Sequence, residues 1–232
     1  MAGSKSIKVE LPRIGGKLIV FEGVEGCGKT TQIQRTLDWL QTIFPSERVV
    51  VTRQPGGTQL GIGIRRLLLD YSEEKPIQDL TELLLYAADR AQHVEEVLKP
   101  ELHNKSIILC DRYTDSTIAY QGYGRGLNLS LIHQLNQLAT GGLKSDLTIW
   151  LDVDVEVSLA RTRGRGVADR IELEAIAFHR QVQQGYTELA KEDPTRILRV
   201  DASLNEIAVQ EQIQAILRQH LAELLNINGS SS

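Results

Sequence analysis

A glycine-rich segment near the start of the chain contains the first residues whose types and spacing could do chemistry. Gly23 is followed, after four residues, by Gly28, Lys29 and Thr30, and the segment lies between an apolar run at 18–21 and an amphipathic stretch. The glycines let the backbone wrap around a phosphate, and the N–H groups at the start of the next helix favour its charge. The lysine can reach the outer phosphates and the threonine hydroxyl can ligate Mg²⁺. A glycine-rich turn with an exposed lysine is the simpler alternative, but the flanking strand and helix favour a nucleoside triphosphate site.

An acidic residue ends a second apolar run. Asp111 follows the run at 107–110 and directly precedes Arg112. At the carboxyl end of a strand, in the same sheet as a phosphate-binding loop, such a residue can hold Mg²⁺ directly or through water. Taken alone, Asp111 would be better interpreted as a helix cap or a solvated side chain. Together with Arg112 and the phosphate-binding loop, we interpret it as a metal ligand.

Two arginines come just after predicted strands. Arg53 follows the run at 48–52, and Arg112 follows the run that ends at residue 110. Because both emerge at the ligand-binding edge of the sheet, they suit a second anionic group, which arginine binds bidentately. An acceptor that is a phosphate monoester is already a nucleophile and needs positioning rather than a strong base. Gln54 stands where a base could reach the acceptor, which favours a monophosphate acceptor over a hydroxyl, although Glu25 also lies nearby.

A basic, glycine-containing segment at about 161–171 lies between two predicted helices. It contains Arg161, Arg163 and Arg165, followed by Asp169 and Arg170. An ordinary solvated loop has a similar composition and would be the better interpretation of this segment alone. Combined with a phosphate-binding loop, the segment predicts a mobile lid, because phosphoryl transfer needs charge stabilisation and exclusion of water.

Short apolar runs alternate along the chain with longer helical patterns. We expect strands at 17–22, 48–52, 106–110, 147–152 and 196–201, and helices at 29–43, 59–70, 80–98, 129–140, 155–163, 172–191 and 204–225. This alternation predicts an α/β fold in which helices cover both faces of a parallel sheet and ligands bind at the carboxyl ends of the strands. Pro100 is expected to end the helix at 80–98.

Composition and charge exclude several classes of protein. The 232 residues carry 26 basic and 30 acidic side chains, a net charge of −4, which argues against a protein that coats nucleic acid. Aromatic residues make up 5%, too few for a platform that stacks single strands. No stretch approaches the roughly 18 apolar residues of a membrane helix, the first residues lack the core of a signal peptide, and the two cysteines fit a reducing cytoplasm. We expect a single domain at 17–225 with polar tails at 1–16 and 226–232.

Five ordered motifs resemble those of bacterial thymidylate kinases, over about residues 17–221. They are F-E-G-V-E-G-C-G-K-T-T at 21–31, T-R-Q-P-G-G-T at 52–58, L-L-Y-A-A-D-R-A-Q-H at 84–93, D-R-Y with a later S and A-Y-Q-G at 111–122, and D-R-I-E at 169–172. The resemblance implies a nucleoside-monophosphate-kinase-like three-layer fold with a P-loop and a five-stranded parallel sheet. It also implies phosphoryl transfer from ATP to dTMP, giving dTDP, with Mg²⁺ and in a homodimer.

The same resemblance implies roles for individual residues. ATP would contact Gly23, Gly26, Cys27, Gly28, Lys29, Thr30 and Thr31, with Arg161 against adenine, and Mg²⁺ would lie near Thr30 and Asp111. The dTMP contacts would be Glu25 at the deoxyribose, Arg53 and Arg112 at the phosphate, Tyr113 at the sugar, and Tyr86, Arg90, Tyr120 and Gln121 at the base, with Pro55 as a further contact. Lys29, Arg53 and Arg112 would be catalytic together with Arg163 or Arg165, because the variable positions of the phosphate loop carry no basic side chain.

Two positions depart from the family pattern. Gln54 stands where the family usually has Glu, which puts in doubt a role of that carboxylate near Mg²⁺ or Arg53. Tyr86 stands where the family more often has Phe; its ring can still stack, but its hydroxyl needs a partner or water. From spacing alone, Tyr86 and Arg90 share a helix face. The simpler interpretation is that Tyr86 is a core aromatic and that Arg90 lies at the surface, paired with Glu82 or Glu95.

Other interpretations of the residues stay open. One is a kinase for another nucleotide or for a deoxynucleoside. Another is a nucleotide-binding switch without an acceptor, against which Arg53, Arg90 and Arg112 argue. We also hypothesise that oxidation of Cys27 blocks ATP binding or joins it to Cys110 in a disulfide; two inert small side chains are the simpler alternative.

Overall fold

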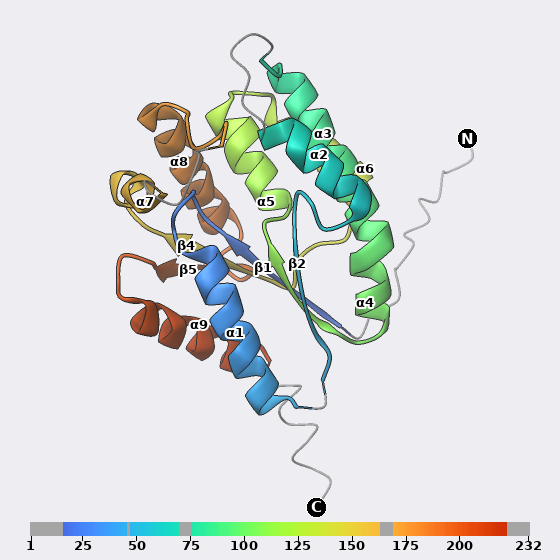
Figure 1. Ribbon diagram of the computed structural model, residues 1–232, viewed down its shortest axis with the longest axis vertical. Helices are drawn as coiled ribbons and strands as arrows, with labels where there is room; N and C mark the ends of the chain where they lie inside the picture. The colour runs from blue at the N-terminus through green and yellow to red at the C-terminus, as the bar shows by residue number, and fades with distance from the viewer. Residues whose placement is uncertain (1–15, 46, 70–75, 163–168, 222–232) are drawn as a thin grey trace, which may run out of the picture.

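The centre of the protein is a five-stranded parallel sheet. In the computed structural model, which describes residues 16–45, 47–69, 76–162 and 169–221, its strands follow the order β2-β3-β1-β4-β5. Their bounds are β1 Lys17–Glu22, β2 Val49–Arg53, β3 Ile107–Asp111, β4 Leu147–Asp152 and β5 Ile197–Asp201. This arrangement confirms the predicted α/β fold, and Figure 1 shows helices on both sides of the strands.

The inner strands β1, β3 and β4 are nearly continuous in apolar residues because they are buried on both faces of the sheet. On one face, Ile19 and Phe21 belong to the large core cluster that also contains apolar side chains of α1 (Lys29–Ile43) and α9 (Glu206–His220). These two helices lie side by side in Figure 1. On the other face, Leu18 and Val20 pack against apolar residues of the segment 94–102. The large cluster also reaches this second face, where the ring of Trp150 stacks on that of Tyr186.

The remaining helices mostly match the sequence pattern. They are α2 Gln59–Leu69, α3 Asp79–His93, η1 Val94–Leu98, α4 Lys99–His103, α5 Thr114–Thr117, η2 Ile118–Gly124, α6 Leu129–Thr140, α7 Val155–Thr162 and α8 Ile176–Glu192. The helical segment at 114–124 has no counterpart in the sequence prediction, and α8 begins four residues later than expected. None of the helices in the described ranges is long and apolar enough to cross a membrane.

The expectation that Pro100 ends its helix is wrong. The helical path continues from α3 through η1, a π-helical turn, into α4, where Pro100 occupies the first turn. The Lys99 N–H bonds to the carbonyl of Val94, five residues back. Proline lacks an N–H and its ring crowds the preceding turn, so a wider turn lets the chain remain helical across it.

The later start of α8 has a local cause. The Asp169 carboxylate accepts hydrogen bonds from the N–H groups of Ile171 and Glu172, each at 3.0 Å. Such a side chain offers the backbone an alternative to helix, so residues 169–175 form turns before α8 begins.

The two cysteines pack in different core clusters. Cys27 packs in the cluster that contains Ile19 and Phe21, whereas Cys110 packs in the cluster that contains Leu18 and Val20. Both are buried and free. The hypothesis that oxidation joins these thiols in a disulfide stays a prediction.

The strand register aligns the ends that carry the site. Phe21 in β1 pairs with Asp111 in β3, and Asp111 pairs with Arg53 in β2. Two further hydrogen bonds extend this register, from Gln54 N to Asp111 O at 2.9 Å and from Arg112 N to Phe21 O at 3.0 Å. The residues that follow the three strands therefore emerge together at one edge.

His93, the last residue of α3, ties that helix to the end of β2. Its buried ring lies between Thr52 Oγ1, 2.6 Å from Nε2, and Gln54 Nε2, 2.7 Å from Nδ1. An amide nitrogen can only donate, so Nδ1 accepts and the proton lies on Nε2, which donates to Thr52. Burial, and then the positive charge of Arg90, lower the pKa of His93 to about 4. The ring is therefore neutral at physiological pH.

This neutral ring predicts a pH-dependent contribution to stability. Between pH 6.5 and pH 4 the unfolded chain binds a proton at His93 that the native state does not, so acid destabilises the native state. The wild type should exceed a His93→Gln variant in free energy of unfolding above pH 6.5. That advantage should shrink by up to about 3 kcal/mol by pH 4. Urea unfolding across this range measures the difference, and a constant difference would contradict the assignment.

Candidate active site

A cavity of about 210 Å³ opens at the carboxyl ends of β1, β2 and β3. Its walls combine the phosphate loop, the ends of β2 and β3, the inner face of α3, the segment 111–121 and the start of the turn before α8. The lining residues are Glu25, Gly26, Gly28, Lys29, Thr30, Thr31, Arg53, Gln54, Pro55, Arg65, Leu69, Tyr86, Arg90, Asp111, Arg112, Tyr113, Ser116, Thr117, Tyr120, Gln121, Asp169 and Ile171. Most of the residues singled out from the sequence therefore share one cavity.

The phosphate loop wraps around the side chain of its own lysine. Lys29 Nζ donates to the carbonyl oxygens of Gly23 and Val24, each at 3.1 Å. Gly26 has a φ of 75°, and a Cβ there would lie 2.1 Å from a backbone oxygen of α7. Gly28 has a φ of 99°. Backbone conformation thus requires both glycines, and close packing also requires Gly26.

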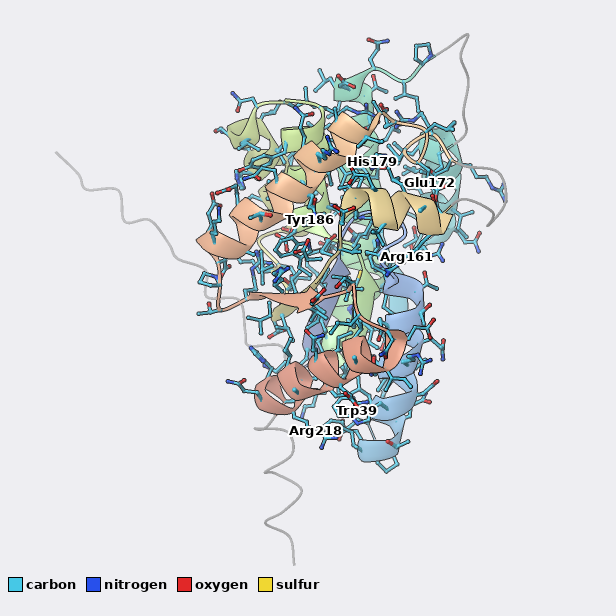
Figure 2. The ribbon with its side chains drawn as sticks, turned by 90° about the vertical axis from the view of Figure 1, so that its left-hand side faces the viewer. Trp39, Arg161, Glu172, His179, Tyr186 and Arg218 are labelled. Atoms are coloured by element: carbon cyan, nitrogen blue, oxygen red, sulfur yellow. The ribbon has the colours of Figure 1, made fainter. Side chains whose placement is uncertain are left out.

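Arg112 is held from several sides by oxygen atoms. Nη1 donates to the Gly23 carbonyl at 3.1 Å, to Ser116 Oγ at 3.2 Å and to Tyr186 OH at 3.3 Å. Nη2 donates to the Glu25 carboxylate and to a tyrosine hydroxyl in η2. Figure 2 shows Tyr186 on α8. The guanidinium is therefore fixed at the cavity wall by elements distant in sequence.

The charge of Glu25 depends on these cations. Burial raises the pKa of its carboxyl, but Arg112 and Lys29 outweigh burial and bring the pKa down to about 2. Glu25 is therefore ionised at physiological pH. Its carboxylate partly neutralises the two cations at the phosphate end of the cavity.

Glu22 is an organising residue that sequence reasoning missed. It ends β1 and is fully buried. Its carboxylate accepts from Tyr113 N at 2.8 Å, from Ser116 N at 3.1 Å and Oγ at 2.6 Å, and from Tyr186 OH at 2.8 Å. It thereby fixes the loop after β3 that carries Arg112. The available signal was an acidic residue ending an otherwise apolar strand, because a carboxylate there must be satisfied internally.

Arg65 on α2 is a second lining residue that the sequence did not reveal. Its Nη1 donates to the Pro55 carbonyl at 3.1 Å. Burial, and then the nearby positive charge of Arg53, lower the pKa of Arg65. Arg53, Arg65 and Arg112 therefore gather at one part of the cavity, where a bound anion would relieve their mutual repulsion.

Arg90 on α3 is buried inside the site and is not a surface partner of Glu82 or Glu95. Its side chain donates to Gln54 Oε1 at 2.9 Å, Thr117 Oγ1 at 2.8 Å, Asn136 Oδ1 at 2.7 Å and Tyr113 O at 2.9 Å. The surface alternative is therefore wrong. Gln54 uses both ends of its amide, one towards Arg90 and one towards the neutral ring of His93.

The aromatic residues take different positions. Tyr86 lines the cavity, and burial raises the pKa of its hydroxyl. Tyr120 accepts a hydrogen bond from Arg112 at 3.0 Å, and its ring lies under that guanidinium. Tyr113 packs in the second core cluster and donates its hydroxyl to Leu143 O at 3.1 Å. Its contact with a sugar stays a prediction.

Asp111 fits the role of a metal ligand. It lines the cavity together with Thr30, and its Oδ1 is shut off from solvent without a hydrogen-bond donor in the described parts of the chain. A bound cation would satisfy such an oxygen. The described residues contain no cluster of three or more His, Cys, Asp or Glu. One carboxylate and one hydroxyl, from Asp111 and Thr30, fit Mg²⁺, which is usually held by one or two side chains together with phosphates and water.

The predicted lid is seen only in part. Arg163 and Arg165 lie outside the described residues. Arg161, near the end of α7 (Figure 2), donates to the Ala202 carbonyl at 3.1 Å. Gly23, Cys27 and Arg161 are not part of the cavity lining, and their contact with a nucleotide stays a prediction.

Comparison with known proteins gives one family. The family model described as thymidylate kinase matches residues 21–213. A thymidylate kinase from Nostoc punctiforme is 68% identical over 91% of this chain and 100% of that protein. One from Trichormus variabilis is 64% identical over the same shares. The structure also resembles that of thymidylate kinase from Ehrlichia chaffeensis, with a TM-score of 0.71 and 35% identity over 88% of this chain and 99% of the other.

The family model spans the phosphate loop, the arginines at the ends of β2 and β3, and the inner face of α3. These are the segments that line the cavity. By sequence, by structure and by the segments that build its site, the chain belongs to the thymidylate kinase family.

Proposed function

We propose that this protein transfers the terminal phosphoryl group of ATP to the phosphate of dTMP, giving dTDP. One observation carries the proposal. A single cavity joins the phosphate loop with Lys29 to a cluster of arginines and then to the polar and aromatic side chains of Tyr86, Arg90 and Gln121. This spatial order suits two phosphorylated molecules whose phosphates meet at the arginines. The base of one of them would lie beside the polar and aromatic side chains.

The chemistry asks for charge and alignment rather than for a base. A phosphate monoester is already anionic, so its oxygen attacks once the two phosphates are held in line. Lys29 would bind the outer phosphates of ATP, while Arg53 and Arg112, together with Arg65, would hold the acceptor phosphate. Gln54 supports this assignment, because its amide is buried between Arg90 and His93 and is not available as a base.

Mg²⁺ would be held by Asp111 and Thr30 together with ATP. When bound, it would neutralise charge on the transferring phosphates. The lid at about 161–171 would supply the remaining cation from Arg163 or Arg165, with Arg161 against adenine. In this proposal residues 17–225 form one kinase domain, which acts in the cytoplasm with its two thiols reduced.

A homodimer is part of the proposal. Helices α2, α3 and α6 lie together on one flank (Figure 1). They expose large apolar side chains, among them Leu67 at 61%, Leu84 at 50% and Leu138 at 80%. A second copy of the chain would cover this face. Because α3 also carries Tyr86 and Arg90 on its inner side, the partner would brace the helix that lines the site.

An acceptor panel tests the reaction and separates it from the alternatives. ATP consumption with Mg²⁺ should rise strongly with dTMP, weakly with dUMP, and not with thymidine, CMP or AMP. Chelation of Mg²⁺ should abolish the activity, and a Lys29→Met variant should lose at least about 100-fold in kcat. Preference for another nucleotide or a deoxynucleoside would support a different kinase. Equal ATP consumption without any acceptor would contradict the proposal and favour a nucleotide hydrolase or switch.

Replacing Arg112 by Lys tests whether the forked guanidinium positions the acceptor. Lysine keeps the charge but cannot reach Gly23, Ser116, Glu25 and Tyr186 together, so kcat/KM for dTMP should fall by about 100-fold or more. Arg48→Lys is the matched control, because Arg48 pairs with Glu101 at the surface. Steady-state kinetics measure both variants. An Arg112→Lys variant that matches the control would show that the guanidinium does not position the acceptor.

A Leu84→Glu substitution tests the dimer. A charge in the centre of the exposed face should convert the protein to a monomer, which light scattering after size-exclusion chromatography would detect. Ile207→Glu is the control, because Ile207 is 64% exposed on α9, away from this face. A wild type that is monomeric at micromolar concentration would refute the assignment.

A further inference from the structure

Glu82 on α3 is a buried carboxylate that the proposed chemistry does not use. It is fully buried and set back behind the cavity lining. Its Oε1 accepts from Gln121 Nε2 at 2.7 Å, and its Oε2 accepts from Arg125 Nη2 at 3.3 Å and from Arg170. Two segments of the chain, 121–125 and the turn that carries Arg170, thus converge on this carboxylate of α3.

The surroundings of Glu82 keep it ionised. Burial raises the pKa of its carboxyl, but Arg125, the hydrogen bond from Gln121 and the charge of Arg170 outweigh burial, so the pKa is lowered. An ionised carboxylate can only accept hydrogen bonds. The Gln121 side chain must therefore turn its NH₂ group towards Glu82.

This constraint decides which atom Gln121 presents to the cavity. With its nitrogen bound to Glu82, the amide directs Oε1 the other way. Gln121 lines the cavity, no donor in the described parts of the chain reaches Oε1, and this oxygen is not shut off from the open space. A ligand therefore meets a hydrogen-bond acceptor at Gln121.

Arg90 supplies the complementary group. One N–H of its Nη2 bonds to Tyr113 O, and the other N–H of this nitrogen has no acceptor among the residues described. The cavity thus offers an acceptor from Gln121 and a donor from Arg90. Thymine and uracil carry an N–H beside a carbonyl and match this pair. Cytosine carries a ring acceptor beside an amino group. Its ring acceptor would therefore face the acceptor of Gln121, and its amino donor would face the donor of Arg90.

We propose that Glu82 is a positioning residue that fixes the orientation of the Gln121 amide and thereby selects an acceptor base with an N–H beside a carbonyl. The inference rests on the proposed function and adds a residue that does not touch the substrate. Rejection of cytosine follows from leaving buried polar groups unpaired, which discriminates more strongly than shape alone.

A Glu82→Gln variant tests the proposal. The new amide can present either its oxygen or its nitrogen, so Gln121 is no longer forced into one orientation. The ratio of kcat/KM for dTMP to that for dCMP should fall at least about 10-fold, mainly through a higher KM for dTMP. A merely structural role would lower both activities equally and leave the ratio unchanged, which would overturn the proposal.

Glu174→Gln is the matched control. Glu174 also pairs with Arg125, at 2.6 Å, and the substitution removes the same charge without touching Gln121. Its dTMP-to-dCMP ratio should equal that of the wild type. A wild type without dTMP kinase activity would refute the proposed function itself. An active wild type whose ratio survives Glu82→Gln would refute the inference alone.

A measurement on the unaltered protein keeps the inference testable if Glu82→Gln does not fold. In ¹⁵N-labelled wild type, the Gln121 side-chain NH₂ should be protected from hydrogen exchange before any ligand is added, because it faces Glu82. Binding of dTMP should protect the thymine imino proton and leave this NH₂ protection unchanged. Protection of the NH₂ that appears only with dTMP would show that the nitrogen faces the base.

Discussion

The parallel register of β1, β2 and β3 is the constraint on which the site depends. Phe21, Asp111 and Arg53 lie abreast, so the next residues of each strand leave the sheet at one level. A slip of β2 by two residues would move Arg53 by about 7 Å, and a slip by one would turn it to the other face. The buried apolar residues of β1 and β3 fix those two strands. Backbone hydrogen bonds to β3 hold β2 at the edge of the sheet, among them Ile107 N to Arg48 O and Gln54 N to Asp111 O, each at 2.9 Å.

The site then has to hold several cations close together. Lys29, Arg53, Arg65 and Arg112 all line the cavity, and their repulsion is partly offset by carboxylates beside Arg112. Glu25 pairs with Arg112, and Glu22 fixes the loop from which that arginine projects. The positive charge is thus oriented before any phosphate enters, which is the arrangement that electrostatic stabilisation of phosphoryl transfer requires.

Much of this organisation was predictable because it depends on short stretches of the sequence. The apolar strands, the phosphate loop and the positions of Arg53 and Arg112 after their strands each depend on neighbours in sequence. The roles of Glu22 and Glu82 could not be predicted, because their partners come from segments 39 to 164 positions away. For Arg90, helical spacing gave the shared face with Tyr86 but not its buried partners, Thr117 and Asn136.

The two π-helical turns, η1 at Val94–Leu98 and η2 at Ile118–Gly124, tie the number of residues in the chain to the shape of the pocket. Removing one residue from a helix rotates everything beyond it by about 100°. In η2 that would turn Gln121 away from Glu82, and in η1 it would turn Leu102 off the sheet. A substitution in these turns alters one side chain, whereas a deletion rotates every residue of the helical segment beyond it. Length is therefore under tighter constraint there than composition, so related chains should differ in these turns by exchange of residues rather than by gaps.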